Sequence, residues 1–536
     1  MSDLDLLDAD PAPDTLNQWA RHLGHRVIDP GGLRAGLSSG PTLSAAFTKT
    51  ARRHPRREAL TINGITLSHQ EVDVESARAG AALQGWGIGA GNHVTVVADT
   101  DLSVVIAYLG ALQVGAIVTF ADPTYTVAEL GRVLAASHAD MALATGPSLA
   151  LIAEAGDGRP TLGLNESDRY LVAHVLHDRL AENVFPAPTD PEATAILAFT
   201  SGSTGAPKPV PLTHRNLLSS MRGALIAWHW SENDRLVHSL PVGHQHGLGG
   251  VHASLLTGSH SVILPRFDAE ELLATIGHHD ATILFAVPAI YQRLVLCKDS
   301  KVEVLGRLRL MVSGSAPLPV PLADRVQGLT GQLPIERYGS TEAGLDVSNP
   351  YRGTRIPGTV GLALPGLEVA LVGEDDRPVD RGESGEVVLR GPQVFSGYLG
   401  ADDGQAFLHG WFRTGDVGTV DEESGHLRLV GRAKEMIITG GANVSPREVE
   451  NVLRSVPGVL DAAVIGAPSP RWGEEVTAFV VLEGSPLERI TDVVVRSLAP
   501  FKRPKRIIEV AEIPRTETGK VRQEALALML ETDTSD

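Results

Sequence analysis

Three adjacent stretches decide the fold: ATAILA (Ala193–Ala198), FTSGSTGAPKPV (Phe199–Val210) and LTHRNLLSSMRGALIAW (Leu212–Trp228). The first is a short apolar run typical of a buried strand, and the third has the length and pattern of a helix. The middle stretch is rich in glycine and hydroxyl residues. A strand, a glycine-rich turn and a helix in succession predict a phosphate site, because backbone N–H groups and a helix N-terminus attract anions.

The residue pattern of this turn does not match the phosphate loop of ordinary NTPases. That loop needs a glycine before its lysine and a serine or threonine after it. Lys208 lies instead between Pro207 and Pro209. A different phosphate-binding loop and a merely flexible turn are therefore the two interpretations of this stretch.

Short apolar runs alternate with helical patterns through much of the chain. NHVTVVA, MALAT, SVILP, ATILFAV and LRLMVSG read as strands, and LSAAFTKTARRHP and LSVVIAYLGALQVGA read as helices. This alternation predicts an α/β fold of mostly parallel sheets covered by helices. After Pro365, the strands LEVALV, SGEVVLRG and GHLRLVG follow one another without helices. They predict a small antiparallel, β-barrel-like subdomain at about residues 362–430.

A second boundary is expected at GRAKEMI (Gly431–Ile437), where a separate apolar pattern begins. Beyond it, SPREVENVLRSV has Ser445 as a helix N-cap, Pro446 at the first helical position and Glu448 placed to complete a capping box. The strands DAAVIGA and TAFVVLE and the helix ITDVVVRSLAP complete a small α+β domain. The chain is thus divided into an N-terminal arm (1–40), a large domain (41–431) and a C-terminal domain (432–536).

Composition limits the functions open to this chain of 536 residues. A formal net charge of −18 argues against nucleic-acid binding, which requires a basic surface. Cys297 is the only cysteine, which excludes an intrachain disulfide and fits a reducing compartment. The sequence shows neither a signal pattern nor an apolar run of ~18 residues, so we expect a soluble, cytoplasmic protein without a membrane span.

Four further short motifs follow the glycine-rich turn. They are YGSTEAG (Tyr338–Gly344) after a predicted strand, RTGD (Arg413–Asp416), GRAKE (Gly431–Glu435) at the domain boundary and PRTETGK (Pro514–Lys520) near the C-terminus. Together with the turn, in this order and at these distances, they resemble the adenylate-forming superfamily of acyl-CoA synthetases, peptide-synthetase adenylation domains and luciferases. The resemblance covers residues from about 42 to 526, and five motifs in register favour the phosphate loop over the flexible turn.

The resemblance implies a reaction in two steps. A carboxylic acid attacks the α-phosphate of ATP to give acyl-AMP and pyrophosphate, and the acyl group then passes to CoA. Such chemistry depends on positioning and charge stabilisation. Lys520 would place a positive charge between the carboxylate and the α-phosphate, and Glu342 would hold Mg²⁺, a hard ion that prefers oxygen ligands. Asp416 would bind the ribose hydroxyls, with Arg432 beside it.

By the same resemblance, ATP would be bound by the motifs and by SGSAPL, the segment that lies along the adenine. The full set is Thr200, Ser201, Gly202, Ser203, Thr204, Gly205, Lys208, Ser313, Gly314, Ser315, Ala316, Pro317, Tyr338, Gly339, Ser340, Thr341, Glu342, Asp416, Arg432 and Lys520. Of these, Thr200, Glu342 and Lys520 would also take part in catalysis.

The segment LPVGHQHGLGG (Leu240–Gly250) offers two imidazoles, but no cysteine and no third spaced ligand support a metal site there. The resemblance instead places His244 at the border of the acyl site, near the reacting carboxylate, as a catalytic residue. Gln245 and Gly339 would also contact the substrate. His246 is interpreted as structural or exposed, as most histidines are.

Within the superfamily, LPxxHxHGL, FAVPAIYQRL and MVSGSAPLP most resemble the malonyl-CoA synthetase branch, which uses small acids. Pro209 replaces the glycine of the usual PKGV, which removes one backbone N–H and predicts a slightly altered grip on the triphosphate. The segment SLLTGSH has no arginine for a second carboxylate. Arg293 in YQRL is the remaining candidate, although it could equally be a surface helix residue. Malonate, an aryl or amino-aryl acid and another small acid therefore all stay open.

The acceptor is open as well. ITGGANVSPRE (Ile438–Glu448) resembles the segment that swings in to admit CoA, with Gly440 and Gly441 allowing close backbone approach. The C-terminal domain is therefore expected to move about the boundary residues. The alternatives to CoA are a carrier-protein thiol, an amine, and nitrite activation for diazotisation of an aryl amine. A nucleotide-binding relative without turnover would be expected to lack Lys520 or Glu342, and both are present.

Overall fold

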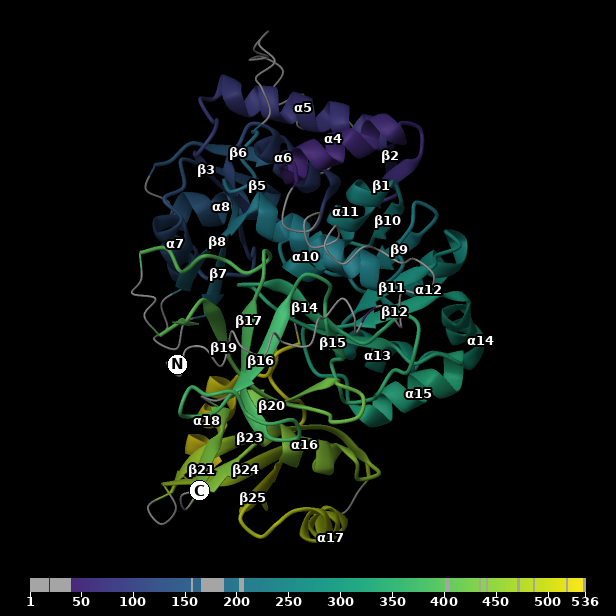
Figure 1. Ribbon diagram of the computed structural model, residues 1–536, viewed down its shortest axis with the longest axis vertical. Helices are drawn as coiled ribbons and strands as arrows, with labels where there is room; N and C mark the ends of the chain where they lie inside the picture. The colour runs from purple at the N-terminus through teal and green to yellow at the C-terminus, as the bar shows by residue number, and fades with distance from the viewer. Residues whose placement is uncertain are drawn as a thin grey trace, which may run out of the picture.

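The computed structural model describes Trp19 and residues 40–155, 158–164, 188–201, 207–400, 405–432, 435–439, 442–469, 473–484, 487–516 and 519–533. Over these ranges the strands form four sheets, with helices packed on them, in a large N-terminal unit and a small C-terminal unit (Figure 1). The predicted α/β class is confirmed. None of the helices in these ranges is both long enough and apolar enough to cross a membrane.

The largest sheet positions most of the predicted site residues. Its strand order is β15-β14-β13-β12-β11-β9-β10-β1-β2. The strands are β1 (Glu58–Ile62), β2 (Ile65–Ser68), β9 (Arg235–His238), β10 (His260–Ile263), β11 (Ile283–Ala286), β12 (Leu310–Ser313), β13 (Ile335–Ser340), β14 (Gly344–Ser348) and β15 (Leu362–Ala363). Pairing is parallel from β1 to β13, so the carboxyl ends of these strands meet at one edge. Ligands of open α/β sheets gather at such an edge.

Helices cover this sheet because their apolar faces need burial. The helix α10 (His214–Ala227) begins at Thr213, whose hydroxyl accepts a hydrogen bond from the N–H of Asn216, and α11 (Gln245–Thr257) begins after His244. The other helices here are α12 (Ala269–His278), α13 (Pro288–Leu294), α14 (Asp299–Val302), the 3-10 helix η2 (Glu303–Arg307) and α15 (Val320–Thr330). The middle strands of the sheet and most of these helices share one core, and β1 and much of α11 pack into a second core.

The N-terminal arm contributes one described residue to the first of these cores. Trp19 is fully buried, and its Nε1 donates a hydrogen bond to the carbonyl oxygen of Ala363 at 2.6 Å. The arm is therefore anchored on the large domain next to β15.

A second sheet of six strands has the order β6-β5-β3-β4-β7-β8. Its strands are β3 (His93–Val97), β4 (Ile117–Ala121), β5 (Met141–Thr145), β6 (Thr161–Leu164), β7 (Thr194–Ser201) and β8 (Pro207–Thr213). The helices of this part of the chain are α4 (Leu43–Arg53), α5 (His69–Gly85), α6 (Leu102–Gln113), α7 (Val127–Ala136) and α8 (Gly146–Ala155). Every pairing is parallel except that of β7 with β8.

The glycine-rich turn joins β7 to the antiparallel strand β8, and α10 begins only after β8. The prediction that a helix N-terminus lies at the phosphate loop was therefore wrong. Proline occupies every second position of PKPVPL (Pro207–Leu212), but β8 is an edge strand, in which Phe199 pairs with Pro209. Alternate residues of an edge strand point their N–H groups away from the neighbouring strand. The prolines therefore remove only N–H groups that would point away from β7. The residues between them keep their hydrogen bonds to β7.

The third sheet is antiparallel throughout, as predicted. It has the order β16-β17-β19-β18, with β20 also paired to β19. These strands are β16 (Glu368–Val372), β17 (Ser384–Arg390), β18 (Phe407–Leu408), β19 (Trp411–Val420) and β20 (Leu427–Arg432). The strand β15, at the start of the predicted subdomain, pairs with β14 in the largest sheet instead.

The C-terminal unit combines a sheet of order β22-β21-β24-β23, to which β25 also pairs, with three helices. Its elements are β21 (Ile437–Thr439), β22 (Ala442–Val444), α16 (Pro446–Arg454), β23 (Val459–Ser469), β24 (Gly473–Leu482), α17 (Leu487–Ser497), β25 (Arg506–Glu509) and α18 (Gln523–Asp533). Ser445 caps α16 as predicted, by accepting from the N–H of Glu448. The Glu448 carboxylate binds Lys502 at 2.7 Å, so it does not turn back toward the cap.

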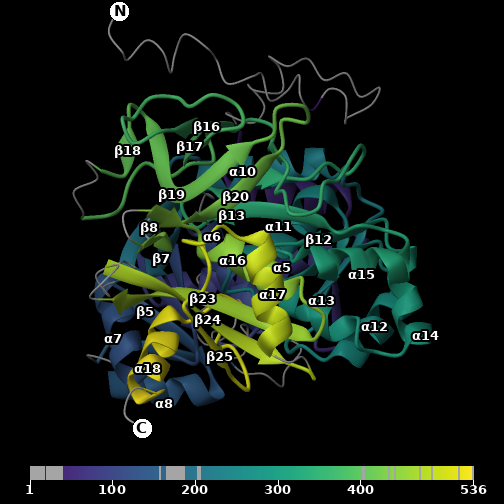
Figure 2. The ribbon, with the colours of Figure 1, turned by 90° about the horizontal axis from the view of Figure 1, so that it is seen from below.

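Figure 2 shows the C-terminal unit in front of the large sheets, with α16, α17, β23 and β24 facing the viewer. Polar contacts between the described parts of the two units include Arg447 of α16 to Glu336 of β13, Gln292 of α13 to the carbonyl oxygen of Leu460, and the Ser445 hydroxyl to the carbonyl oxygen of Val430 in β20. The boundary at residues 431 and 432 and the motion about it remain predictions, since Ala433 and Lys434 lie outside the described residues.

Candidate active site

The predicted motifs meet where β7, β12 and β13 end. Thr200 and Ser201 end β7, Ser313 ends β12, and Tyr338, Gly339 and Ser340 end β13. YGSTEAG turns at once into β14, and a side chain at Gly339 would collide with the carbonyl oxygen of Gly344. Only glycine fits there, so the hairpin closes tightly and holds Glu342 at the sheet edge.

Glu342 is tied to the phosphate loop through Tyr398. Its Oε1 accepts a hydrogen bond from the Tyr398 hydroxyl at 2.8 Å. The Lys208 ammonium lies 5.1 Å from the centroid of the same ring, within cation–π range. The N–H of Leu399 also donates to the carbonyl oxygen of Pro209 at 3.1 Å. Tyr398 therefore contacts both Lys208 of the loop and Glu342 of the hairpin.

A second polar chain links the largest sheet to the antiparallel sheet. The Tyr338 hydroxyl donates to Oδ2 of Asp416 at 2.5 Å, and Oδ1 of Asp416 lies 3.1 Å from Nε of Arg432. The Thr414 hydroxyl accepts from the N–H of Asp416 at 3.0 Å. Burial, and then the charge of Asp416, raise the pKa of Tyr338, so its hydroxyl stays protonated as a donor. Asp416 is thus held from both sheets.

Lys520 reaches this region from the C-terminal unit. Its ammonium is close enough to Arg432, Asp416, Glu342 and Glu435 to feel their charges. Burial lowers the pKa of Lys520 most, Arg432 lowers it further, and the three carboxylates oppose the shift. The side chain keeps accessible surface, so a ligand could reach the ammonium.

The SGSAPL segment follows β12 and is supported by β13. Ser315 has a φ of 68°, in the left-handed region that few residues other than glycine adopt. The N–H of Leu318 donates to Oε1 of Glu336 at 3.1 Å. A side chain at Gly314 would collide with Arg337, so this glycine lets the guanidinium lie across the segment.

Polar atoms without partners gather beside this segment. The Nδ1 of His246 lies 3.3 Å from the Ser315 hydroxyl, and its ring centroid lies 5.3 Å from that of Phe285. In the part of the chain that the structure describes, Nε2 of His246, Oγ of Ser313 and Nε of Arg337 are buried and make no hydrogen bond. Burial, with help from Arg337, lowers the pKa of His246 well below its usual value, so the imidazole is neutral.

Arg337 is a buried cation, with only 8% of its surface exposed. Burial lowers its pKa to about 10, so the guanidinium remains charged at neutral pH. Asp346 is its nearest negative charge, but burial raises the pKa of Asp346, which accepts from Gln393 and Ser340. The Nε of Arg337 makes no hydrogen bond in the part of the chain that the structure describes. A buried charge without a partner is unfavourable, so this arrangement suits an anionic ligand.

His244 lies at the N-cap of α11 and makes no capping bond with its side chain. Burial lowers its pKa, Asp122 opposes the shift, and Lys520 reinforces it, so the ring is neutral. The neighbouring Gln245 donates from Nε2 to the carbonyl oxygen of Thr341 at 2.8 Å. The start of α11 is therefore fixed to the turn that carries Glu342.

The structure brings the described motif residues to one region, while their individual roles remain predictions. Gly202, Ser203, Thr204 and Gly205 of the phosphate loop, and Gly440 and Gly441, lie outside the described residues. The side chain of Ser201 is not described either.

Arg293, the sequence candidate for binding a second carboxylate, remains a prediction. Its side chain is exposed on α13, next to Gln292, which contacts the C-terminal unit. Arg337 is the buried arginine at the site. His246, interpreted from the sequence as structural or exposed, lies beside Ser315 with an unpaired nitrogen.

Two residues at the site carried signals that the sequence interpretation missed. Arg337 lies next to Glu336 in the strand β13, so two charges occur directly before the YGSTEAG motif in a strand that runs into the sheet. Tyr398 stands in SGYLG, a short turn after β17 whose aromatic residue had no evident core to join. Charged or aromatic residues at strand ends next to a motif would have indicated both.

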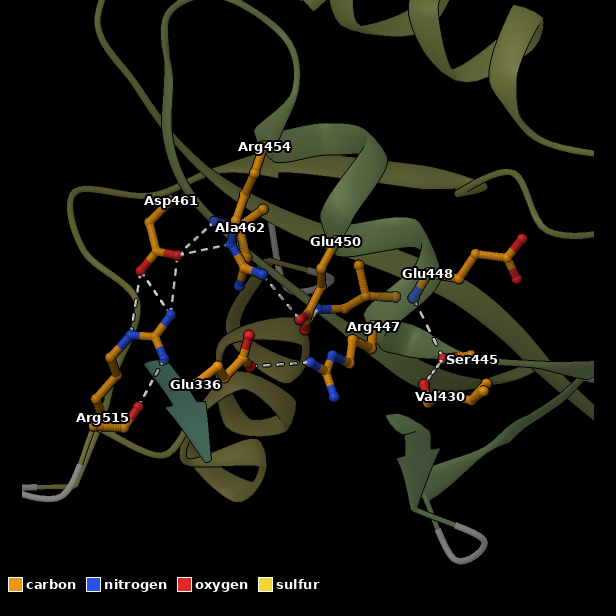
Figure 3. Close-up of polar contacts among 12 residues, drawn as sticks. Glu336, Val430, Ser445, Arg447, Glu448, Glu450, Arg454, Asp461, Ala462 and Arg515 are labelled. Carbon is orange, nitrogen blue, oxygen red and sulfur yellow. Dashed lines mark hydrogen bonds and ion pairs between the residues drawn. The ribbon is translucent and has the colours of Figure 1, made fainter. Parts of the chain in front are cut away.

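The contact between Glu336 and Arg447 joins the two units close to the site (Figure 3). The Arg447 Nη2 lies 3.8 Å from Oε1 of Glu336. Burial raises the pKa of Glu336 to about 7 and lowers the pKa of Arg447. Both shifts favour the neutral forms, so desolvation outweighs the attraction at this distance. The pair therefore holds the units together only weakly.

Comparison with known proteins agrees with this geometry. The family model described as AMP-binding enzyme matches residues 47–399, and the model described as AMP-binding enzyme C-terminal domain matches residues 448–520.

The malonate–CoA ligase ACSF3 of Mus musculus is 36% identical over 377 residues, which are 63% of this chain and 64% of that protein. The oxalate–CoA ligase of Arabidopsis thaliana is 33% identical over 91% of this chain and 98% of that enzyme. The crystal structure of ATP-bound MatB from Rhodopseudomonas palustris superposes with a TM-score of 0.84 at 31% identity, over 91% of this chain and 99% of that one. The chain belongs to the AMP-binding enzyme family and is an adenylate-forming acid–CoA ligase that uses ATP and Mg²⁺.

Proposed function

We propose that the protein activates a small dicarboxylic acid of about malonate size and transfers the acyl group from AMP to CoA. The observation that carries the proposal is Arg337, a buried guanidinium whose Nε makes no hydrogen bond in the described structure and whose charge is opposed only by Asp346, itself a buried group with a raised pKa. A substrate with a second carboxylate would neutralise this charge. A simple acyl or aryl group would leave it unpaired and buried, which is unfavourable.

The surroundings of Arg337 suit a small anion. Neutral His246 can donate from one ring nitrogen, and the hydroxyl of Ser313 is a further donor without a partner in the described structure. The N-terminus of α11 adds positive potential on the same side. Phe285 packs against His246, which leaves little room for a large acyl group.

The nucleotide end would supply the remaining groups. Lys208 and the loop hydroxyls would bind the phosphates, and Asp416 would bind the ribose. A carboxylate oxygen of the acid attacks the α-phosphorus, the bond to the pyrophosphate oxygen breaks, and Lys520 stabilises the charge that builds up. In the second step the CoA sulfur attacks the acyl carbon and AMP leaves.

Glu342 fits a Mg²⁺ ion that neutralises phosphate charge. No group of three metal-ligating side chains occurs within the described ranges. Phosphate oxygens and water would complete the shell of such an ion, as is usual for Mg²⁺ at nucleotides. Tyr398 already occupies Oε1 of Glu342, which leaves Oε2 as the candidate ligand atom.

The names of the relatives support both the acid and the acceptor, since malonate and oxalate are dicarboxylic acids. Transfer to a carrier-protein thiol, to an amine, or nitrite activation would be outcomes other than the one proposed. The mouse relative is described as mitochondrial, and a cytoplasmic location for this protein remains our prediction.

The test is ATP–pyrophosphate exchange with malonate, methylmalonate, oxalate, propionate and benzoate, followed by thioester formation with CoA. We expect the purified protein to favour the dicarboxylic acids. Arg337→Met should reduce kcat/KM for malonate by about 10²-fold or more, because a charge-assisted pair is lost, and should change propionate little.

Arg307→Met is the matched control, because it removes an exposed arginine from the same domain. It should leave exchange unchanged. Equal use of propionate and malonate by the unaltered protein, or an equal loss for both acids in Arg337→Met, would refute the proposal.

A further inference from the structure

The loop that carries Lys520 is fixed by Arg515. The Arg515 Nη1 donates to the carbonyl oxygen of Gly519 at 2.8 Å. The N–H of Lys520 donates to the Thr516 hydroxyl at 3.1 Å, and the N–H of Thr516 donates back to the carbonyl oxygen of Lys520 at 2.8 Å. These bonds set the direction in which the Lys520 side chain leaves the backbone.

Arg515 is in turn held by Asp461 at the start of β23 (Figure 3). Its Nη2 lies 2.8 Å from Oδ2 and 2.9 Å from Oδ1 of Asp461, and its Nε lies 3.2 Å from Oδ2. This two-point geometry fixes the guanidinium plane as well as its distance, which a single contact would not do.

Asp461 is itself immobilised. Its Oδ1 accepts from the N–H of Ala462 at 2.8 Å and from Nε of Arg454 at 3.4 Å. Arg454 also pairs with Glu450 at 3.4 Å, and Glu450 accepts from the N–H of Val464 at 3.0 Å. Figure 3 shows these side chains running from α16 through Asp461 to Arg515.

The same strand start touches the large domain. The carbonyl oxygen of Leu460, next to Asp461, accepts from Nε2 of Gln292 on α13 at 3.2 Å. This contact therefore ties the position of Asp461 to the large domain, where ATP is expected to bind. A chain of direct contacts leads from α13 through β23 and Arg515 to the backbone of Lys520.

We propose that Asp461 is a positioning residue for adenylation, which acts through Arg515 and the Gly519 carbonyl to aim Lys520 at the reacting phosphate. A long lysine side chain on a loop has many conformations, and fixing its backbone reduces the entropy lost when it binds. A displacement of about 1 Å in such a group can lower a rate about 10²-fold. The inference rests on the proposed function only in that Lys520 serves the first half-reaction.

The test is Asp461→Asn, which keeps the shape and removes the charge. We expect adenylation, measured by pyrophosphate exchange, to fall about 10- to 100-fold, because Lys520 is no longer held in place. Thioester formation from supplied acyl-adenylate should stay within about twofold of the unaltered protein, because Lys520 does not serve that step. Hydrogen exchange at the amide of Lys520 should become faster.

A double variant separates positioning from general damage. In the Lys520→Ala protein, adding Asp461→Asn should change the remaining adenylation by no more than about twofold, since the lysine it positions is gone. A full additional loss in that background would overturn the proposal. Equal losses in the two half-reactions would overturn it too.

Two further variants act as controls. Glu475→Gln breaks the 3.0 Å pair with Arg506, another carboxylate–arginine pair of the same domain, and should leave adenylation unchanged. Arg515→Lys keeps the positive charge but loses the two-point contact of the guanidinium with Asp461, so it should reduce adenylation less than Asp461→Asn does. It also provides a test if Asp461→Asn folds poorly. Normal adenylation in Arg515→Lys would refute the proposal. Failure of the dicarboxylate assignment would appear separately, in the unaltered protein, as exchange with a different acid.

Discussion

We call the region of Tyr338, Asp416, Tyr398 and Glu342 the nucleotide end of the proposed site, and the region of Arg337, His246 and Ser313 its acyl end. The polar side chains of the two ends differ in whether they have hydrogen-bond partners. At the nucleotide end, Tyr338 donates to Asp416 and Tyr398 donates to Glu342. At the acyl end, Arg337 and His246 each keep a buried nitrogen that has no hydrogen bond in the described structure.

This difference separates shared from specific recognition. Side chains that bond one another before a ligand arrives hold the geometry for a nucleotide common to the whole family. Side chains left without partners make the protein itself less stable, and the ligand that pairs with them recovers that free energy. If the proposed function is correct, the acyl end should discriminate between acids and the nucleotide end should not.

The largest effect is expected for Glu342→Gln, which changes the nucleotide end. Loss of the carboxylate should slow adenylation by about 10²–10³-fold and raise the Mg²⁺ concentration needed for half-maximal rate, because charge at the phosphates is less well neutralised. A Mg²⁺ titration of pyrophosphate exchange measures it. Tyr398→Phe, which removes only the hydrogen bond, should have a smaller effect; an unchanged titration in Glu342→Gln would show that Glu342 is not a ligand.

Glu336 extends the comparison because its carboxylate contacts Arg447 and the N–H of Leu318, yet burial still raises its pKa. Burial raises its pKa from 4.5 to about 7, so between these values the folded protein holds a proton that the unfolded chain has released. Stability should therefore fall as the pH rises through this window, on the order of 2–3 kcal/mol. Unfolding midpoints at pH 5 and pH 7.5 should differ less in Glu336→Gln than in the unaltered protein. Parallel pH profiles would contradict the shift.

Tyr338→Phe tests whether the paired nucleotide end contributes to stability without ligand. Removing the hydroxyl leaves one oxygen of buried Asp416 without its donor, which should lower the free energy of unfolding by about 1–3 kcal/mol. Thermal unfolding without ligand measures it. No change in the melting temperature would show that the bond to Asp416 is not needed in the free protein.

Ser313→Ala makes the opposite test at the acyl end and should have the smallest effect. The Ser313 hydroxyl is buried without a partner in the described residues, so its removal should not lower the free energy of unfolding and should raise it by about 1 kcal/mol. The KM for the acid should nevertheless rise. A clear loss of stability would mean that the hydroxyl already has a partner in the free protein.

Much of the fold could be predicted because the deciding signals are local. Alternating apolar runs gave the strands β3, β5, β10, β11 and β12, and the serine before Pro446 marked the start of α16. The strand β8 could not be predicted this way. Its three prolines are unfavourable for a strand in general and acceptable only at an edge, and edge position depends on the order of strands in the sheet.

The acyl end was predicted less well for a similar reason. Arg293 follows Gln292 and Arg337 follows Glu336, so both arginines have a polar neighbour in the sequence, and only the packed structure shows that one is exposed and the other buried. His246 looked like an ordinary histidine because its neighbours Ser315 and Phe285 are distant in the sequence. Burial and partners arise from tertiary contacts, which a single sequence does not show.

The prolines of β8 also affect how this protein meets other molecules. An exposed edge strand normally offers a row of N–H groups and carbonyl oxygens on which a strand from another chain can pair. Pro207, Pro209 and Pro211 have no N–H to offer, and the carbonyl oxygen of Pro209 already accepts from Leu399. The sheet edge next to the glycine-rich loop is therefore a poor template for strand addition. This edge is therefore protected against edge-to-edge aggregation.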